Sequence, residues 1–137
     1  MSWRPALLIV CSILFFTPAI PSRVQKTTSR ASDDSYSSAL AAANRFLHAW
    51  QTEDHETGLM MLTDSARQHT TGARLKQFFS SGSQAAFEIR HGRRLSPGEY
   101  VFPVVLFGLS EPPSRPHTSK IIITKVGDDD WAIDRLP

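Results

Sequence analysis

The side chains that could carry acid–base or metal chemistry are few and widely spaced in this chain. None of the five histidines stands in a His-x-x-x-His pair; they are His48, His55, His69, His91 and His117. The single cysteine lies in an apolar run near the N-terminus, and Asp128-Asp129-Asp130 lacks the alternating ligand spacing of a calcium loop. No glycine-rich phosphate loop or Gly-x-Ser-x-Gly turn is present. We therefore expect no metal site and no cofactor.

General acid–base catalysis requires an ionisable side chain inside a pocket. Glu88 and Asp134 alternate with apolar residues in segments of strand-like pattern, so we expect both carboxylates to point away from the interior. His69, His91 and Tyr100 remain as candidates, and they belong to three separate elements with no evident pairing. These observations favour a non-enzymatic role over catalysis, with an enzyme that uses one of these three residues as the alternative.

The N-terminal residues have the pattern of an export signal. Residues 6–16 form an apolar run, ALLIVCSILFF, that follows Arg4 and ends at Thr17-Pro18-Ala19. This run is shorter than the roughly 20 residues that span a bilayer. We predict that residues 1–22 are a signal peptide and that the protein is exported, to a periplasm or outside the cell. The alternative is an uncleaved N-terminal anchor, which is the one membrane attachment that we expect.

The region after the signal peptide is predicted to be helical from about residue 37. Residues 23–36 are rich in Ser and Thr and are predicted to be a flexible polar tether. Helices are predicted over residues 37–53, 54–69 and 73–80. The first of these carries an apolar stripe at helical spacing, made by Leu40, Ala43, Leu47 and Trp50.

After Gly82 the pattern changes to that of strands. We predict strands over residues 85–93, 99–109, 120–126 and 131–136, with turns at Ser96-Pro97-Gly98 and at residues 127–130. Pro103 within the second strand predicts a bulge or bend there. Helices followed by consecutive antiparallel strands indicate an α+β domain in which the helices pack on one curved sheet.

Two segments resemble the NTF2-like superfamily, including its SnoaL-like and exported uncharacterised members. They are ANRFLHAWQTEDHETGLMMLTDSAR, residues 43–67, and KVGDDDWAIDRL, residues 125–136. The resemblance implies a cone-shaped domain over residues 37–137, with an apolar pocket between the first helix and the concave sheet. The pocket candidates are then Trp50, His69, His91, Tyr100 and Trp131.

The function expected from these observations is non-enzymatic binding of a small apolar ligand or of a protein partner in the cell envelope. The alternatives are a small-molecule isomerase or lyase with an acid–base group in the cone, and a dimerising interaction module. The 15 Lys and Arg are nearly balanced by 13 Asp and Glu, and the basic segment RHGRR, residues 90–94, alternates between two faces. No nucleic-acid partner is therefore expected.

Overall fold

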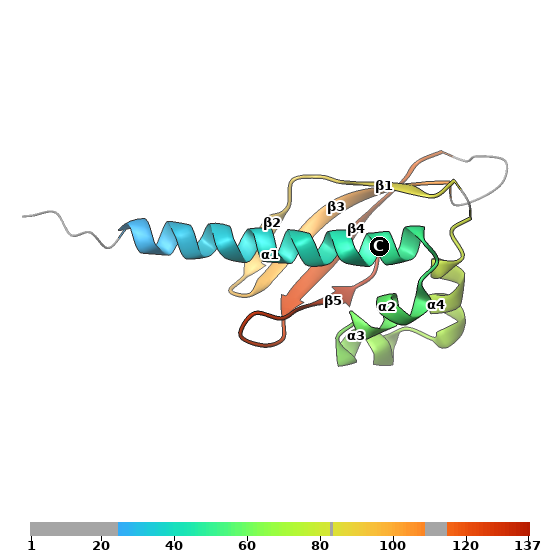
Figure 1. The fold of residues 1–137 in the computed structure, drawn as a ribbon, viewed down its shortest axis with the longest axis horizontal. Coiled ribbons are helices and arrows are strands. Elements are labelled where there is room, and N and C mark those ends of the chain that lie inside the picture. Colours follow the sequence, from blue (N-terminus) through green and yellow to red (C-terminus); the bar gives the residue numbers. More distant parts are fainter. Residues whose placement is uncertain (1–24, 83, 109–114) are drawn as a thin grey trace, which may run out of the picture.

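A computed structural model describes residues 25–82, 84–108 and 115–137, with side chains from Asp34 onward. One long helix, α1 (Gln25–Gln51), lies across an antiparallel sheet, and three short helices gather at one end of it (Figure 1). The predicted α+β architecture is confirmed. No helix within the described ranges is long and apolar enough to cross a membrane.

Helix α1 begins at Gln25, well before the predicted start at residue 37. The region from Gln25 to residue 36, predicted to be a tether, is therefore helical. Its Ser and Thr residues are weak helix formers, but neither Gly nor Pro interrupts the chain from residue 25 to residue 51. The helix ends at Gln51, and Glu53, two residues later, adopts a left-handed conformation with φ 56°. There the Asp54 N–H donates to the Ala49 carbonyl at 2.8 Å, which satisfies a free helix-end acceptor.

The predicted helix over residues 54–69 is two helices, α2 (His55–Met60) and α3 (Asp64–His69). The chain between them pairs with the last strand. The Thr63 N–H donates to the Ile133 carbonyl at 2.9 Å, and the Ile133 N–H donates to the Met61 carbonyl at 2.8 Å. These bonds replace helical ones, so the helix is interrupted. Helix α4 (Gly72–Phe79) follows, one residue from its predicted position.

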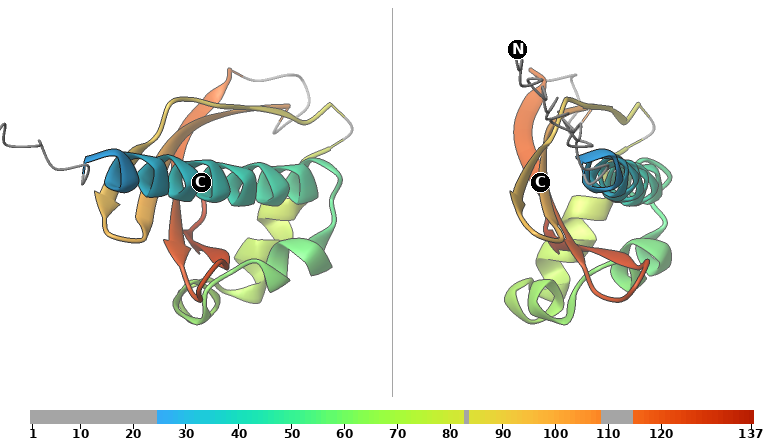
Figure 2. Two further views of the ribbon diagram at one scale, coloured as in Figure 1. Left: turned by 60° about the vertical axis from the view of Figure 1, so that its left-hand side comes forward. Right: turned by 90° about the vertical axis from the view of Figure 1, so that its left-hand side faces the viewer.

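Five antiparallel strands form the sheet. They are β1 (Ala86–Ile89), β2 (Arg93–Ser96), β3 (Glu99–Phe107), β4 (His117–Lys125) and β5 (Trp131–Arg135). Strand β3 is central: β1 and β2 pair with one of its edges, and β4 pairs with the other and carries β5. Figure 2 shows the sheet curving around α1, which lies against one face of the sheet. The predicted ranges 99–109, 120–126 and 131–136 correspond to β3, β4 and β5 and differ from them by up to three residues at an end. Residue 109 lies outside the described residues.

The predicted strand over residues 85–93 is shortened to β1, and β2, which begins at Arg93, was not predicted. Pro103 lies opposite the gap between β1 and β2. The pairing of Pro103 with Lys120 on β4 is unbroken, so the predicted bulge in β3 is wrong. On the other edge, the Arg90 N–H donates to the Pro103 carbonyl at 2.9 Å. Because the amide and carbonyl of one strand residue face the same edge, the missing N–H of Pro103 faces the gap. The interruption of strand pairing therefore lies in the segment between β1 and β2, and β3 itself is regular.

Large side chains fill the space between α1 and the sheet. The indole of Trp50 is fully buried, and its N–H donates to the Phe78 carbonyl at 2.8 Å. The rings of Phe46 and Phe79 meet edge to face at 5.7 Å. Ten large side chains are less than 2% exposed: Trp50, Phe46, Phe79, Phe102, Leu47, Leu106, Ile121, Ile123, Ile133 and Val104. The interior is thus a packed core.

Candidate functional site

Three of the five pocket candidates are core residues. Trp50, Tyr100 and Trp131 are 0%, 4% and 8% exposed, respectively. The rings of Tyr100 and Trp131 pack against one another with centroids 5.7 Å apart. These side chains therefore belong to the core between α1 and the sheet, where they pack with other buried residues.

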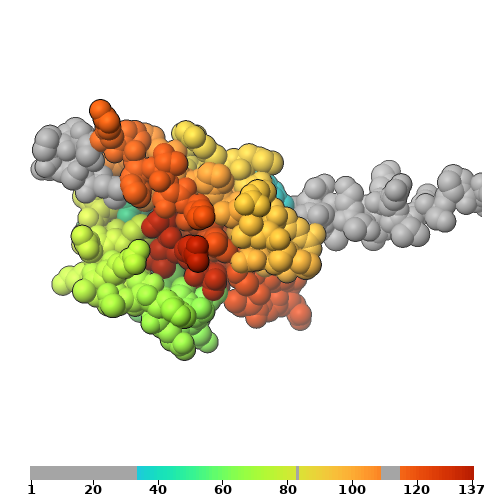
Figure 3. Space-filling view, turned by 180° about the vertical axis from the view of Figure 1, so that it is seen from behind, coloured from blue at the N-terminus to red at the C-terminus, as the bar shows by residue number. Residues whose placement is uncertain are grey.

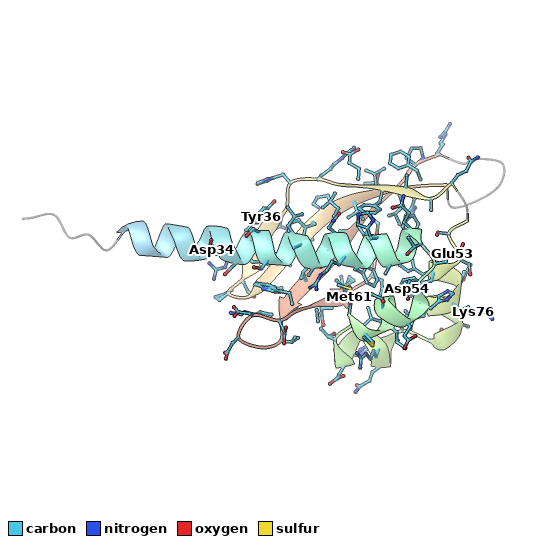
Figure 4. The ribbon with its side chains drawn as sticks, viewed as in Figure 1. Asp34, Tyr36, Glu53, Asp54, Met61 and Lys76 are labelled. Atoms are coloured by element: carbon cyan, nitrogen blue, oxygen red, sulfur yellow. The ribbon has the colours of Figure 1, made fainter. Side chains whose placement is uncertain are left out.

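His91 is exposed, and its ring centroid is 5.6 Å from that of Tyr36. Figure 4 labels Tyr36 on α1. The Tyr36 hydroxyl is 3.4 Å from His91 Nδ1, and it accepts a hydrogen bond from the Gly92 N–H at 3.1 Å. The Tyr36 ring also meets those of Tyr100 and Phe102. Sequence reasoning missed Tyr36 because it falls in the predicted tether. These contacts fasten α1 to the connection between β1 and β2.

His69 is the pocket candidate that lines an open cleft. The cleft has a volume of about 650 Å³ and lies between α3–α4 and strands β4 and β5. From behind, the dark red residues of β5 and the C-terminus lie between the green short helices and the orange β4 (Figure 3). The ionisable side chains that line it are His69, Arg74, His117, Lys120, Asp134 and Arg135.

The backbone of α3 sets the orientation of the His69 ring. Nδ1 of His69 is 2.8 Å from the carbonyl oxygen of Ser65, one turn earlier. A carbonyl can only accept a hydrogen bond, so Nδ1 carries the proton and Nε2 is the acceptor when the ring is neutral. His69 can therefore accept a proton, or a hydrogen bond from a ligand, through Nε2.

Asp134 is half-buried and lines the same cleft, and it also lines a second cleft of about 760 Å³ beside the β2–β3 turn and the end of β4. Its Oδ1 accepts a hydrogen bond of 2.9 Å from the Thr63 hydroxyl. The same hydroxyl caps α3, because it accepts the Ala66 N–H at 3.0 Å. Asp134 is therefore partly shielded from solvent, and the cleft that it lines lies outside the packed core. Glu88, by contrast, is exposed as predicted and pairs with Arg90 at 3.2 Å.

The lining side chains make the cleft electropositive. Arg74, Lys120 and Arg135 are cationic at neutral pH and Asp134 is anionic, so these side chains sum to +2 before either histidine is protonated. The cations come from α4, β4 and β5 and share no local motif, so sequence reasoning missed them. A concave site with excess positive charge can attract and bind a small anion.

A transition-metal site is not supported by the described ranges. Among the residues that the structure describes, no three His, Cys, Asp or Glu side chains come together as metal ligands.

Comparison with known proteins identifies the fold. No family model matches the chain, and no curated protein matches it. A ketosteroid isomerase-like protein from Erwinia carotovora atroseptica SCRI1043 is 17% identical, with a TM-score of 0.54 over 73% of this chain and 91% of that one. An uncharacterised cystatin-fold protein from Novosphingobium aromaticivorans DSM is 14% identical, with a TM-score of 0.49 over 72% of this chain and 97% of that one. The chain has the NTF2-like α+β fold.

Proposed function

We propose that this protein is a binding protein for a small anionic ligand, which it holds in the cleft between α3–α4 and β4–β5. The observation that carries the proposal is the convergence of Arg74, Lys120 and Arg135, from three elements, around one concave surface. Guanidinium groups form paired hydrogen bonds with carboxylate and phosphate oxygens, and lysine adds a point charge.

The expectation of an apolar ligand inside the cone is replaced by this proposal. An apolar ligand would need space between α1 and the sheet, and that space holds large side chains such as Trp50 and Phe102, both 0% exposed. The cleft is lined instead by charged and polar groups. Binding without catalysis stays the expected activity, and a protein partner and a homodimer stay predictions.

Substitution of Arg135 tests the anion site. We expect Arg135→Gln to weaken the binding of sulfate about tenfold, because it removes a charge-assisted interaction from the cleft. The matched control is Arg93→Gln, since Arg93 is also an exposed strand arginine but lies on β2, away from the cleft. Isothermal titration calorimetry at low ionic strength measures both. Equal losses of affinity in the two variants would contradict the proposal.

We also propose that the protein is exported after removal of residues 1–22, which lie outside the described residues. The apolar run and the Thr17-Pro18-Ala19 break support cleavage between Ala19 and Ser22. Sequencing of the exported protein is expected to find an N-terminus between Ile20 and Arg23. A product that keeps Met1 and stays in the membrane fraction would favour the anchored alternative.

A further inference from the structure

Asp134 is an unusual component of a site for an anion. Among the described residues that line the cleft, it is the one acidic side chain. A carboxylate would repel a ligand that carries only negative charge, and at close range in a partly buried site that repulsion is not fully screened.

The carboxylate of Asp134 forms no ion pair within 4.0 Å among the described residues. In the described parts of the chain, the ion pairs within 4.0 Å are Arg67–Asp64 and Arg90–Glu88, and neither involves Asp134. Asp134 therefore keeps its charge available to a ligand while Arg74, Lys120 and Arg135 keep theirs.

Asp134 is also held in place before any ligand binds. The Thr63 hydroxyl donates to Oδ1 at 2.9 Å, and Thr63 is itself buried and fixed as the cap of α3. A carboxylate has about four lone-pair sites, so one such bond leaves capacity for further donors. A preorganised acceptor loses less entropy when a ligand donor binds to it.

We propose that the ligand of the cleft is a small zwitterion, in which an anionic group binds the cluster of Arg74, Lys120 and Arg135 and an ammonium group binds Asp134. This inference rests on the proposed anion-binding function and specifies its ligand class. A zwitterion can pair with both the cations and the carboxylate of the cleft, whereas a plain anion can pair with the cations alone. Because Asp134 disfavours simple anions, it acts as the element that selects the ligand.

Matched ligand pairs test the inference. O-phosphoethanolamine and ethyl phosphate share a phosphate monoester and differ by one ammonium group; β-alanine and propionate form the equivalent carboxylate pair. Near pH 8 the phosphate is mostly dianionic and the amine is protonated, at roughly two pH units from each pKa. In calorimetric titrations we expect the zwitterion of at least one pair to bind about tenfold more tightly than its partner. The pair that shows this preference identifies the anionic group.

Asp134→Asn separates charge recognition from a purely structural role. Asparagine keeps an Oδ1 that can accept the Thr63 hydroxyl, so the cap of α3 is preserved while the charge is removed. We expect this variant to bind both members of the preferred pair within about twofold of one another, with the plain anion bound more tightly than before. Equal affinities in the unsubstituted protein, or a preference that survives in Asp134→Asn, would overturn the inference and leave the anion site standing. If none of the four ligands and no sulfate binds, the proposed function itself is wrong.

Discussion

Trp50→Ala is expected to lower the free energy of unfolding by about 3–5 kcal/mol, the range for truncation of a large buried aromatic. The Trp50 side chain is 0% exposed, and its ring lies 6.0 Å from that of Phe78. The substitution leaves a cavity, and it also removes the donor of the 2.8 Å hydrogen bond to the Phe78 carbonyl. The measurement is equilibrium unfolding in urea, followed by circular dichroism.

Leu95→Ala is the control for this truncation. Leu95 lies on β2 and is 39% exposed, so its removal is expected to change the stability by no more than about 0.5 kcal/mol. A loss below about 1 kcal/mol in Trp50→Ala would mean that the indole is not in the core.

Gly58→Ala is expected to destabilise the protein by about 1–3 kcal/mol, because it overfills the core. A Cβ at this position would lie 1.9 Å from Cζ of Phe79, and that ring is only 1% exposed. The ring cannot move aside without disturbing Phe46 and Phe78, which it contacts edge to face. Thermal unfolding monitored by circular dichroism measures the change.

Gly72→Ala is the control, because it makes the same substitution at a helix glycine where the added methyl group meets no other atom of the described chain. Gly72 begins α4, and a Cβ there would have no heavy atom within 4 Å among the described residues. Alanine is the better helix former by up to about 1 kcal/mol, so this variant is expected to be equally or more stable. If Gly58→Ala also raised the stability, the close packing of α2 against Phe79 would be refuted.

The local patterns that were predicted correctly depend on neighbouring residues only. The stripe of Leu40, Ala43, Leu47 and Trp50 predicted which face of α1 meets the sheet, and those residues are buried or half-buried there. The alternation around Trp131 and Ile133 likewise predicted the core-facing side of β5. Both patterns can be recognised in the sequence because the residues on one face of a helix or strand recur with the period of that element.

The misplaced boundaries have causes outside the segments concerned. The break between α2 and α3 exists because Met61 and Thr63 pair with Ile133, at least 70 residues further on. The gap between β1 and β2 lies opposite Pro103 of a different strand. The early start of α1 was missed because polar composition was read as a tether, although no helix breaker is present.

The amino-acid sequence alone determined the α+β class and the apolar faces of α1 and β5, because these follow from periodicity and composition along the chain. Only the tertiary structure decided that His69 and Asp134 share a cleft with Arg74, Lys120 and Arg135. These residues come from four elements, and a charge on one element carries no information about which other elements will be packed beside it. Electrostatic interaction depends on distance in space, and the fold sets that distance.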